Sequence, residues 1–380
     1  MKRYILVAGV DYPHYTNALT PAHLRLPNMR YAVLPFRKYC NERAKQIQRE
    51  NRKNKEDSTI QIFDFNSGQV ITQITKFHGR TEKIGMAIPT KRKSPITIKN
   101  YACVVRKNQI WFRNFKNGQR DTLSIKDVYD EVELIGKYHR NELEQLHFFS
   151  HAYQKGPILV NSIDDRFETR GSKAYPLAPE ERDPDDKDGR AGLDLKPKNI
   201  DLQNFMEAFS KSGYIWNWGC NNSQDLVSKV YKIMYDSVTT TFRKGYNNIS
   251  VSDDSVFEFS DLNDEEFAFF SRNLKKSDAL FPNKNSMIVK FKWLKWLVCD
   301  LALSTENYNY YVAQTAKVKV YGGPYGTSST GDSHGMRIEE KFKEIVNFFA
   351  NHLRFKFGEK SWYMLYAPER RCDPPTATGP

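Results

Sequence analysis

The sequence lacks the features that define several large protein classes. None of its apolar runs reaches the roughly 18 residues that a membrane-spanning helix requires, so we expect no membrane span. The patterns H-E-x-x-H, G-x-G-x-x-G and C-x-x-C are absent, which argues against a zincin, a dinucleotide-binding protein and a structural zinc site. The chain opens with a brief apolar run that has no small-residue cleavage site. We therefore expect no signal peptide and synthesis in the cytoplasm.

Cysteine is scarce, with five residues scattered at positions 40, 103, 220, 299 and 372. Their odd number and wide spacing indicate neither a disulfide framework nor a metal site. They favour a protein that is made in a reducing cytosol. We expect no cofactor and no bound metal.

Basic residues outnumber acidic ones, and the formal net charge is +13. This excess favours an anionic partner, such as nucleic acid, a membrane surface or an acidic protein. A soluble basic protein without such a partner fits the charge equally well. Much of the excess lies in residues 37–55, which are expected to form one solvated helical face.

The chain has ample material for a packed core, with 24 Phe, 21 Tyr and 6 Trp among 380 residues. Apolar runs at residues 4–10 and 60–65 indicate two buried strands, and a helical pattern from Arg30 to about Arg52 lies between them. A strand-helix-strand opening favours a parallel sheet with right-handed crossovers. We therefore expect an α/β fold in which helices flank a mostly parallel sheet, with an antiparallel β insertion and a second, irregular insertion.

The expected organisation is a single α/β domain over residues 1–367. Alternating apolar runs separated by turn residues predict the β insertion at about 69–121. Asp, Pro, Gly and Arg dominate 164–199, which indicates a long exposed loop, and polar residues at about 245–285 indicate the irregular insertion. Further along the chain, we expect a helix from an Asp201 N-cap to Gly213, a core helix over 287–303 and an amphipathic helix over 338–353. The tail, 368–380, is expected to be disordered.

Two reactive side chains follow short apolar runs that read as core strands. His151 follows the run Leu146–Phe149, and Cys220 follows the run Tyr214–Trp218. In an open parallel sheet, ligands bind at the carboxyl ends of the strands. Asp11 and Asp64 also stand at expected strand ends, so we expect all four side chains at one edge of the sheet.

The position of Cys220 suits a nucleophile. A helix is expected to begin at Asn222 or Ser223, and its N-terminus would lower the pKa of the thiol. An imidazole beside the thiol can act as a base and then give a proton to the leaving group. The main-chain N–H groups of Gly219 and of the residues after Cys220 are candidates for an oxyanion hole. Alternatively, Cys220 is a small buried residue and His151 a hydrogen-bonded turn residue.

The segments LHFFSHA and IWNWGC, in this order on successive strands, resemble the caspase-like cysteine peptidases, the superfamily of caspases, gingipains, separases and CHAT proteins. In that fold the catalytic His and Cys end adjacent strands of a parallel sheet. The resemblance implies that His151 is the dyad histidine, that Cys220 is the nucleophile, and that the substrate is a protein or peptide. Ala152 stands where that superfamily usually has Gly, and Trp218-Gly219 where it has Gln-Ala or Ser-Ala.

The overall layout also resembles bacterial toxins or effectors that are delivered by specialised secretion systems. That resemblance implies export by a route without a signal peptide and a cognate inhibitor or immunity protein.

A glycine-rich loop at residues 322–335 offers a different function. Glycines let main-chain N–H groups approach an anion, so the loop and the basic surface are candidates for binding a nucleotide or nucleic acid without thiol chemistry. We instead favour a mobile loop that shapes the substrate pocket of the Cys220 site. In a third hypothesis, the β insertion docks a partner protein. The candidate contact residues in the loop are Gly322, Gly323, Gly326, Asp332 and His334.

Overall fold

The computed structural model describes the chain in part. The described residues are 1–9, 36–65, 67, 69–78, 81–84, 88–92, 123, 125–159, 167–170, 173–176, 195–197, 199–221, 252–260, 262–275, 278–332, 335–358 and 362–375.

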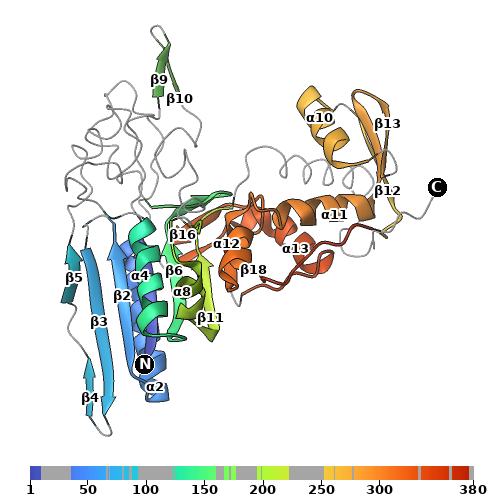
Figure 1. Ribbon diagram of the computed structural model, residues 1–380. Helices are drawn as coiled ribbons and strands as arrows, with labels where there is room; N and C mark the ends of the chain where they lie inside the picture. The colour runs from blue at the N-terminus through green and yellow to red at the C-terminus, as the bar shows by residue number, and fades with distance from the viewer. Residues whose placement is uncertain are drawn as a thin grey trace.

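A nine-stranded mixed sheet lies at the centre of the fold (Figure 1). Its central strands are parallel, and antiparallel strands are added at both edges. The expected α/β class with a mostly parallel core sheet is therefore confirmed. In spatial order the strands are β18 (Met364–Tyr366), β15 (Lys319–Gly322), β11 (Phe209–Asn217), β6 (Leu143–Phe149), β1 (Lys2–Ala8), β2 (Ser58–Asp64), β3 (Gln69–His78) and β4 (Thr81–Ile84), while β5 (Ile88–Arg92) pairs with β3.

Helices cover both faces of the parallel strands, which explains why β1 and β2 are apolar without alternation. The helix α2 (Phe36–Asn54) packs on one face, where Tyr4, Leu6 and Ala8 of β1 point. The opposite face carries Ile5 and Val7 and packs against three helices (Figure 1). These are α4 (Ile125–Tyr138), α8 (Leu202–Ala208) and α12 (Tyr308–Ala316).

The Asp201 cap is confirmed, because its side chain accepts a hydrogen bond from the Asn204 N–H at 3.1 Å. The expected end of this helix at Gly213 is wrong. The helix ends at Ala208, and the chain turns directly into β11 at Phe209. Tertiary pairing decides this, since Phe209 already pairs with Leu143 of β6 and the register then shifts before Tyr214.

The antiparallel strands β3, β4 and β5 fall within the expected insertion at 69–121 and widen the sheet beyond β2. Within 164–199, residues 167–170 and 173–176 pair as the hairpin β9 (Phe167–Arg170) and β10 (Lys173–Pro176), so that part is not a plain loop.

The second insertion is more regular than the sequence indicated. It contains β12 (Val256–Phe259), α10 (Asp264–Asn273) and β13 (Ala279–Asn283), which complete a three-stranded antiparallel sheet with β14 (Ser286–Lys290) (Figure 1). The core helix expected over 287–303 therefore begins late, as α11 (Phe291–Ala302). Strand pairing takes Ser286–Lys290 because Met287 and Val289 point into the core while their neighbours do not.

The amphipathic helix expected over 338–353 also begins late. Residues 335–338 form β17 (Gly335–Ile338), which pairs with β16 (Ser329–Asp332) in a separate two-stranded sheet. A 3₁₀ turn, Glu340–Phe342, then leads into α13 (Lys343–Asn351).

A disulfide joins Cys299 of α11 to Cys372 in the tail, a pairing that the spacing of the cysteines did not indicate. The two residues are 73 positions apart in the sequence, and only the fold brings their Cα atoms to 5.9 Å. The described tail residues, 368–375, differ from the expected disorder. Arg370 donates to the Leu353 carbonyl at 2.6 Å, and Arg371 donates to the Tyr310 hydroxyl at 2.9 Å.

Candidate functional site

The two predicted reactive residues follow neighbouring parallel strands. His151 begins the short strand β7 (His151–Tyr153), two residues after β6 ends, and Cys220 lies three residues after β11 ends. The strands β6 and β11 are adjacent, with Phe148 opposite Asn217. Both residues therefore leave the sheet at its carboxyl edge.

Gly219 is the point of closest approach between the two segments. A Cβ atom on Gly219 would lie 2.3 Å from the Ala152 Cβ, 2.7 Å from the Ala152 nitrogen and 2.9 Å from the Ser150 carbonyl oxygen. No larger residue fits there unless the segments part. The turn that carries Cys220 is thus pressed against the segment that carries His151.

The N-terminus of α2 packs beside His151. The Phe36 ring meets the His151 ring edge-on, with centroids 5.4 Å apart. The next residue, Arg37, donates to Asp64 at the end of β2 (Nη1 to Oδ2, 2.6 Å). Asp64, a predicted strand-end carboxylate, is fully buried at the same edge, where this ion pair ties α2 to β2. Asp11 lies outside the described residues.

Main-chain groups of Ser329, the first residue of β16, hold the thiol of Cys220. The Ser329 N–H donates to Sγ at 3.2 Å, and Sγ lies 3.9 Å from the Ser329 carbonyl oxygen. Burial raises the pKa of the Cys220 thiol, and the Glu339 carboxylate adds to the rise, whereas the Ser329 N–H opposes it. The expected lowering of the pKa is therefore wrong, because burial outweighs the donors. The helix expected from Asn222 or Ser223 lies outside the described residues.

The N–H groups expected to form an oxyanion hole serve another purpose here. The Gly219 N–H donates to the Asn217 side chain at 3.3 Å, and the Asn221 N–H donates to the Thr327 carbonyl at 2.9 Å. Both bonds stabilise the turn around Cys220. The expectation that these two N–H groups are available to donate to a substrate oxygen is wrong for this structure.

Buried asparagines, which sequence reasoning missed, anchor this turn. Asn217 donates to Asn309 (Nδ2 to Oδ1, 3.2 Å), and Asn221 donates to the Gly323 carbonyl at 2.8 Å and to the Tyr366 hydroxyl at 3.0 Å. These residues are almost completely buried. Buried amides are costly unless they are paired, so the network holds the segment in one arrangement. The sequence signal was a cluster of asparagines directly after strands, as in WNWGCNN.

The glycine-rich loop does reach the Cys220 turn, and its first residues pack closely there. Gly322 ends β15 so close to Asn309 that a Cβ atom would lie 2.3 Å from the amide nitrogen. The Gly323 carbonyl accepts bonds from Asn221 and Tyr366, and the Gly326 N–H donates to the Asn221 carbonyl at 2.9 Å. Residues 322–327 are buried.

The remaining loop residues form the β16–β17 hairpin. Asp332 ends β16 and pairs with Gly335, while His334 lies outside the described residues. Sequence reasoning missed that residues 331–335 match the pattern G-x-S-x-G. In serine hydrolases that pattern joins a strand of the main sheet to a helix. Here it joins two strands of a separate hairpin, so the context of a nucleophile elbow is absent.

Stacked aromatic rings run beneath the site, across β6, β11 and β15. Trp218 stacks on Phe149 with centroids 5.5 Å apart, and Trp216 stacks on both Trp218 and Tyr321 at 4.5 and 4.6 Å. His147 lies within this group and accepts a hydrogen bond at Nδ1 from the Trp218 indole at 2.9 Å. Burial lowers the pKa of His147 well below its usual value, assisted by the charge of Arg43. His147 is thus a neutral structural residue.

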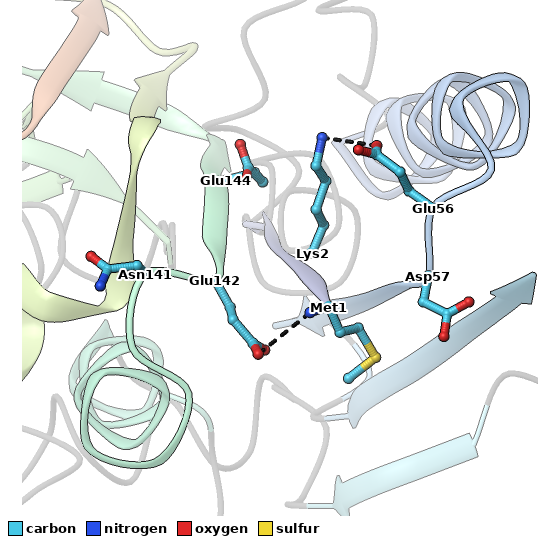
Figure 2. A pocket seen from close by; sticks show the side chains of 7 residues that line it. All are labelled: Met1, Lys2, Glu56, Asp57, Asn141, Glu142 and Glu144. Carbon is cyan, nitrogen blue, oxygen red and sulfur yellow. Dashed lines mark hydrogen bonds and ion pairs between the residues drawn. The ribbon is translucent and has the colours of Figure 1, made fainter.

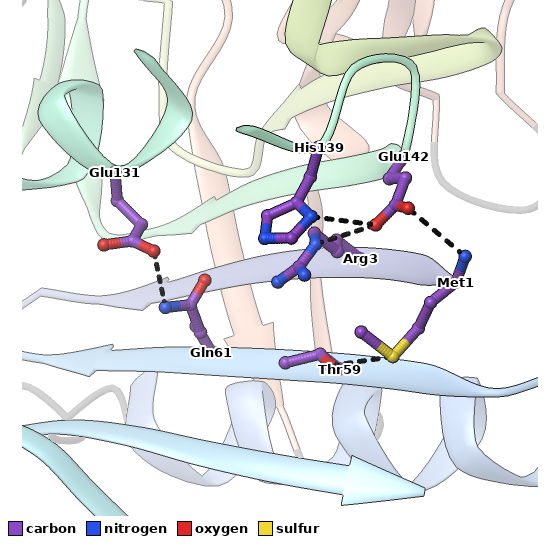
Figure 3. Close-up of polar contacts among 7 residues, drawn as sticks. All are labelled: Met1, Arg3, Thr59, Gln61, Glu131, His139 and Glu142. Carbon is purple, nitrogen blue, oxygen red and sulfur yellow. Dashed lines mark hydrogen bonds and ion pairs between the residues drawn. The ribbon is translucent and has the colours of Figure 1, made fainter. Parts of the chain in front are cut away.

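A shallow pocket of about 410 Å³ lies at the opposite edge of the sheet, where β1, β2 and β6 begin (Figure 2). Its lining is mostly acidic, and several charges are paired. Lys2 contacts Glu56 at 2.8 Å, and Glu142 contacts both the Met1 amine at 3.4 Å and Arg3 at 2.9 Å (Figure 3). This pocket is separated from His151 and Cys220 by the length of the strands.

Among the described residues, no three His, Cys, Asp or Glu side chains are grouped so that they could hold a metal ion. Nor does that part of the chain contain a helix long and apolar enough to cross a membrane. Comparisons with protein-family models, curated proteins and solved structures found no match.

Proposed function

We propose that this protein is a cysteine-dependent hydrolase that cleaves an acyl bond in a protein or peptide. Cys220 is the nucleophile and His151 the acid/base. One observation carries the proposal: the two residues follow adjacent parallel strands, and Gly219 holds their segments in contact. This placement also supports the resemblance to caspase-like peptidases, whose dyad ends adjacent strands.

The proposed reaction has two stages. His151 takes the proton from the Cys220 thiol as sulfur attacks the acyl carbon, and it then gives that proton to the leaving group, which yields an acyl-enzyme. Water attacks the acyl-enzyme in the second stage, with His151 as base. His151 returns that proton to the Cys220 sulfur as the bond between carbon and sulfur breaks, and the acid product leaves as a carboxylate after losing its own proton to solvent. Atoms and protons balance over the cycle.

The raised pKa of Cys220 makes the base essential. A thiol whose pKa lies above its ordinary value is almost entirely protonated at neutral pH, and the thiolate is the reactive form. Attack therefore requires that a neighbouring group remove the proton as the bond forms. Loss of His151 should accordingly reduce activity about as severely as loss of Cys220.

The test compares Cys220→Ala and His151→Ala with Cys40→Ala, a matched loss of a buried thiol outside the proposed site. Hydrolysis of a fluorogenic peptide library and toxicity on bacterial expression are measured for each. We expect the first two variants to lose activity by a factor of at least about 10³, as removal of members of a catalytic unit does. Cys40→Ala should retain it. Full activity in Cys220→Ala would refute the proposal and favour the anion-binding alternative, which predicts polyanion affinity that falls steeply with salt.

A further inference from the structure

The β16–β17 hairpin crosses the proposed site. Ser329, at the start of β16, bonds to the Cys220 thiol through its main chain. Met336, in β17, belongs to the buried cluster that contains Phe36 and Phe149. Phe36 is the residue whose ring meets His151. The two strands thus run from the nucleophile to the surroundings of the acid/base.

Ser329 is held on the Cys220 side by side-chain bonds as well. Its Oγ donates to the Gly219 carbonyl at 2.9 Å and lies 3.1 Å from the Tyr363 hydroxyl, which also bonds to the Trp218 carbonyl at 2.5 Å. The Cys220 turn, β16 and the C-terminal segment therefore meet at one point. An acyl group that approaches the thiol from the β16 side meets Ser329 first.

The hairpin is nevertheless not part of the central sheet. Its strands pair only with each other among the described strands, and a two-stranded ribbon alone is marginally stable. Near the site, its attachment depends on the contacts of Ser329 and on the burial of Met336 and Ile338, which are 6% and 1% exposed.

We propose that β16 and β17 form a lid over the proposed site. This structure is the closed form, in which Ser329 of the lid is hydrogen-bonded to the thiol of Cys220. Opening breaks the Ser329 bond to Sγ and admits water and substrate. The lid regulates the proposed hydrolase site and thus rests on the proposed function.

The test measures how fast iodoacetamide alkylates Cys220, quantified by mass spectrometry of the Cys220 peptide. In the native wild-type protein we expect alkylation at least tenfold slower than in the urea-unfolded chain. Met336→Ala removes a buried anchor of the lid and should accelerate native alkylation at least about tenfold. The matched control is Met287→Ala, a buried strand methionine in the other core cluster, which should not accelerate it.

Ile338→Val offers a milder change for the case in which Met336→Ala does not fold, and it should accelerate alkylation about two- to tenfold. Native wild-type alkylation as fast as in the unfolded chain would overturn the lid. Equal alkylation rates in folded Met336→Ala and folded Met287→Ala would also overturn it. Alkylation requires no enzymatic turnover, so failure of the lid is distinguishable from failure of the hydrolase, which the activity of Cys220→Ala decides.

Discussion

The close contact at Gly219 provides a direct test of how the site is assembled. In Gly219→Ala the new Cβ would lie 2.3 Å from the Ala152 Cβ, and real Cβ atoms essentially never approach within 3.0 Å of a heavy atom outside their own residue and its chain neighbours. Backbone atoms of Ser150 and Ala152 are also in the way, so no rotamer change relieves the clash. The Cys220 turn and the His151 segment must part by roughly 1 Å.

Two effects of different size follow. Overpacking of this kind typically lowers the free energy of unfolding by about 1–3 kcal/mol. Displacement of reacting groups by roughly 1 Å can lower the rate on the order of 10²-fold. We therefore expect a modest shift in the urea midpoint together with a large loss of hydrolytic activity in protein that remains folded.

Gly213→Ala is the matched control. Its Cβ would lie 2.8 Å from the Leu143 carbonyl oxygen, so it strains the same pair of strands, but at the opposite edge. Gly213→Ala should lower the free energy of unfolding by a similar amount to Gly219→Ala and retain activity. The double variant Gly219→Ala with Ala152→Gly removes the closest clash and should restore part of the activity. If Gly219→Ala and Gly213→Ala retain equal activity, the contact does not position the dyad.

Two further predictions concern stability. The Cys299–Cys372 disulfide closes a span of 73 residues, so its reduction should lower the free energy of unfolding by up to about 4 kcal/mol, and a reductant should shift the urea midpoint of the wild type but not of Cys372→Ser. An unchanged midpoint on reduction would contradict this. His147 binds a proton far more weakly in the folded than in the unfolded chain, where its pKa is about 6.5, so stability should fall below that pH by up to about 1.4 kcal/mol per pH unit. His147→Gln should show a shallower pH dependence between pH 5 and about 6.5, and an unchanged slope would refute the assignment.

Local patterns in the sequence were sufficient for much of the core. The apolar runs in β1 and β2 are long enough to indicate strands that are buried on both faces. Asp201 was recognisable as a helix cap because that role depends on neighbours three residues away. The strand ends at His151 and Cys220 followed from the same reasoning, because an end is a local property.

Where tertiary pairing competes with local pattern, the sequence reading failed. Residues 286–290 have the composition of the helix that follows them, but pairing with β12 and β13 makes them a strand. Phe209 likewise leaves its helix because β6 offers a partner. Cys299 and Cys372 carry no spacing signal, and only the tertiary structure brings them together.

For the site, the sequence determined which residues could act as nucleophile and as acid/base, and that each of them follows a strand. Only the tertiary structure decided that β6 and β11 are neighbours, since strand order depends on long-range packing. The environment of the thiol was decided in the same way. A local helix N-terminus would have favoured the thiolate, but burial raises the pKa of Cys220 instead, although the Ser329 N–H of β16, from elsewhere in the chain, opposes the rise. The pKa of a side chain depends on all the residues that surround it in the folded protein. A single sequence contains those residues but does not show which of them are in contact.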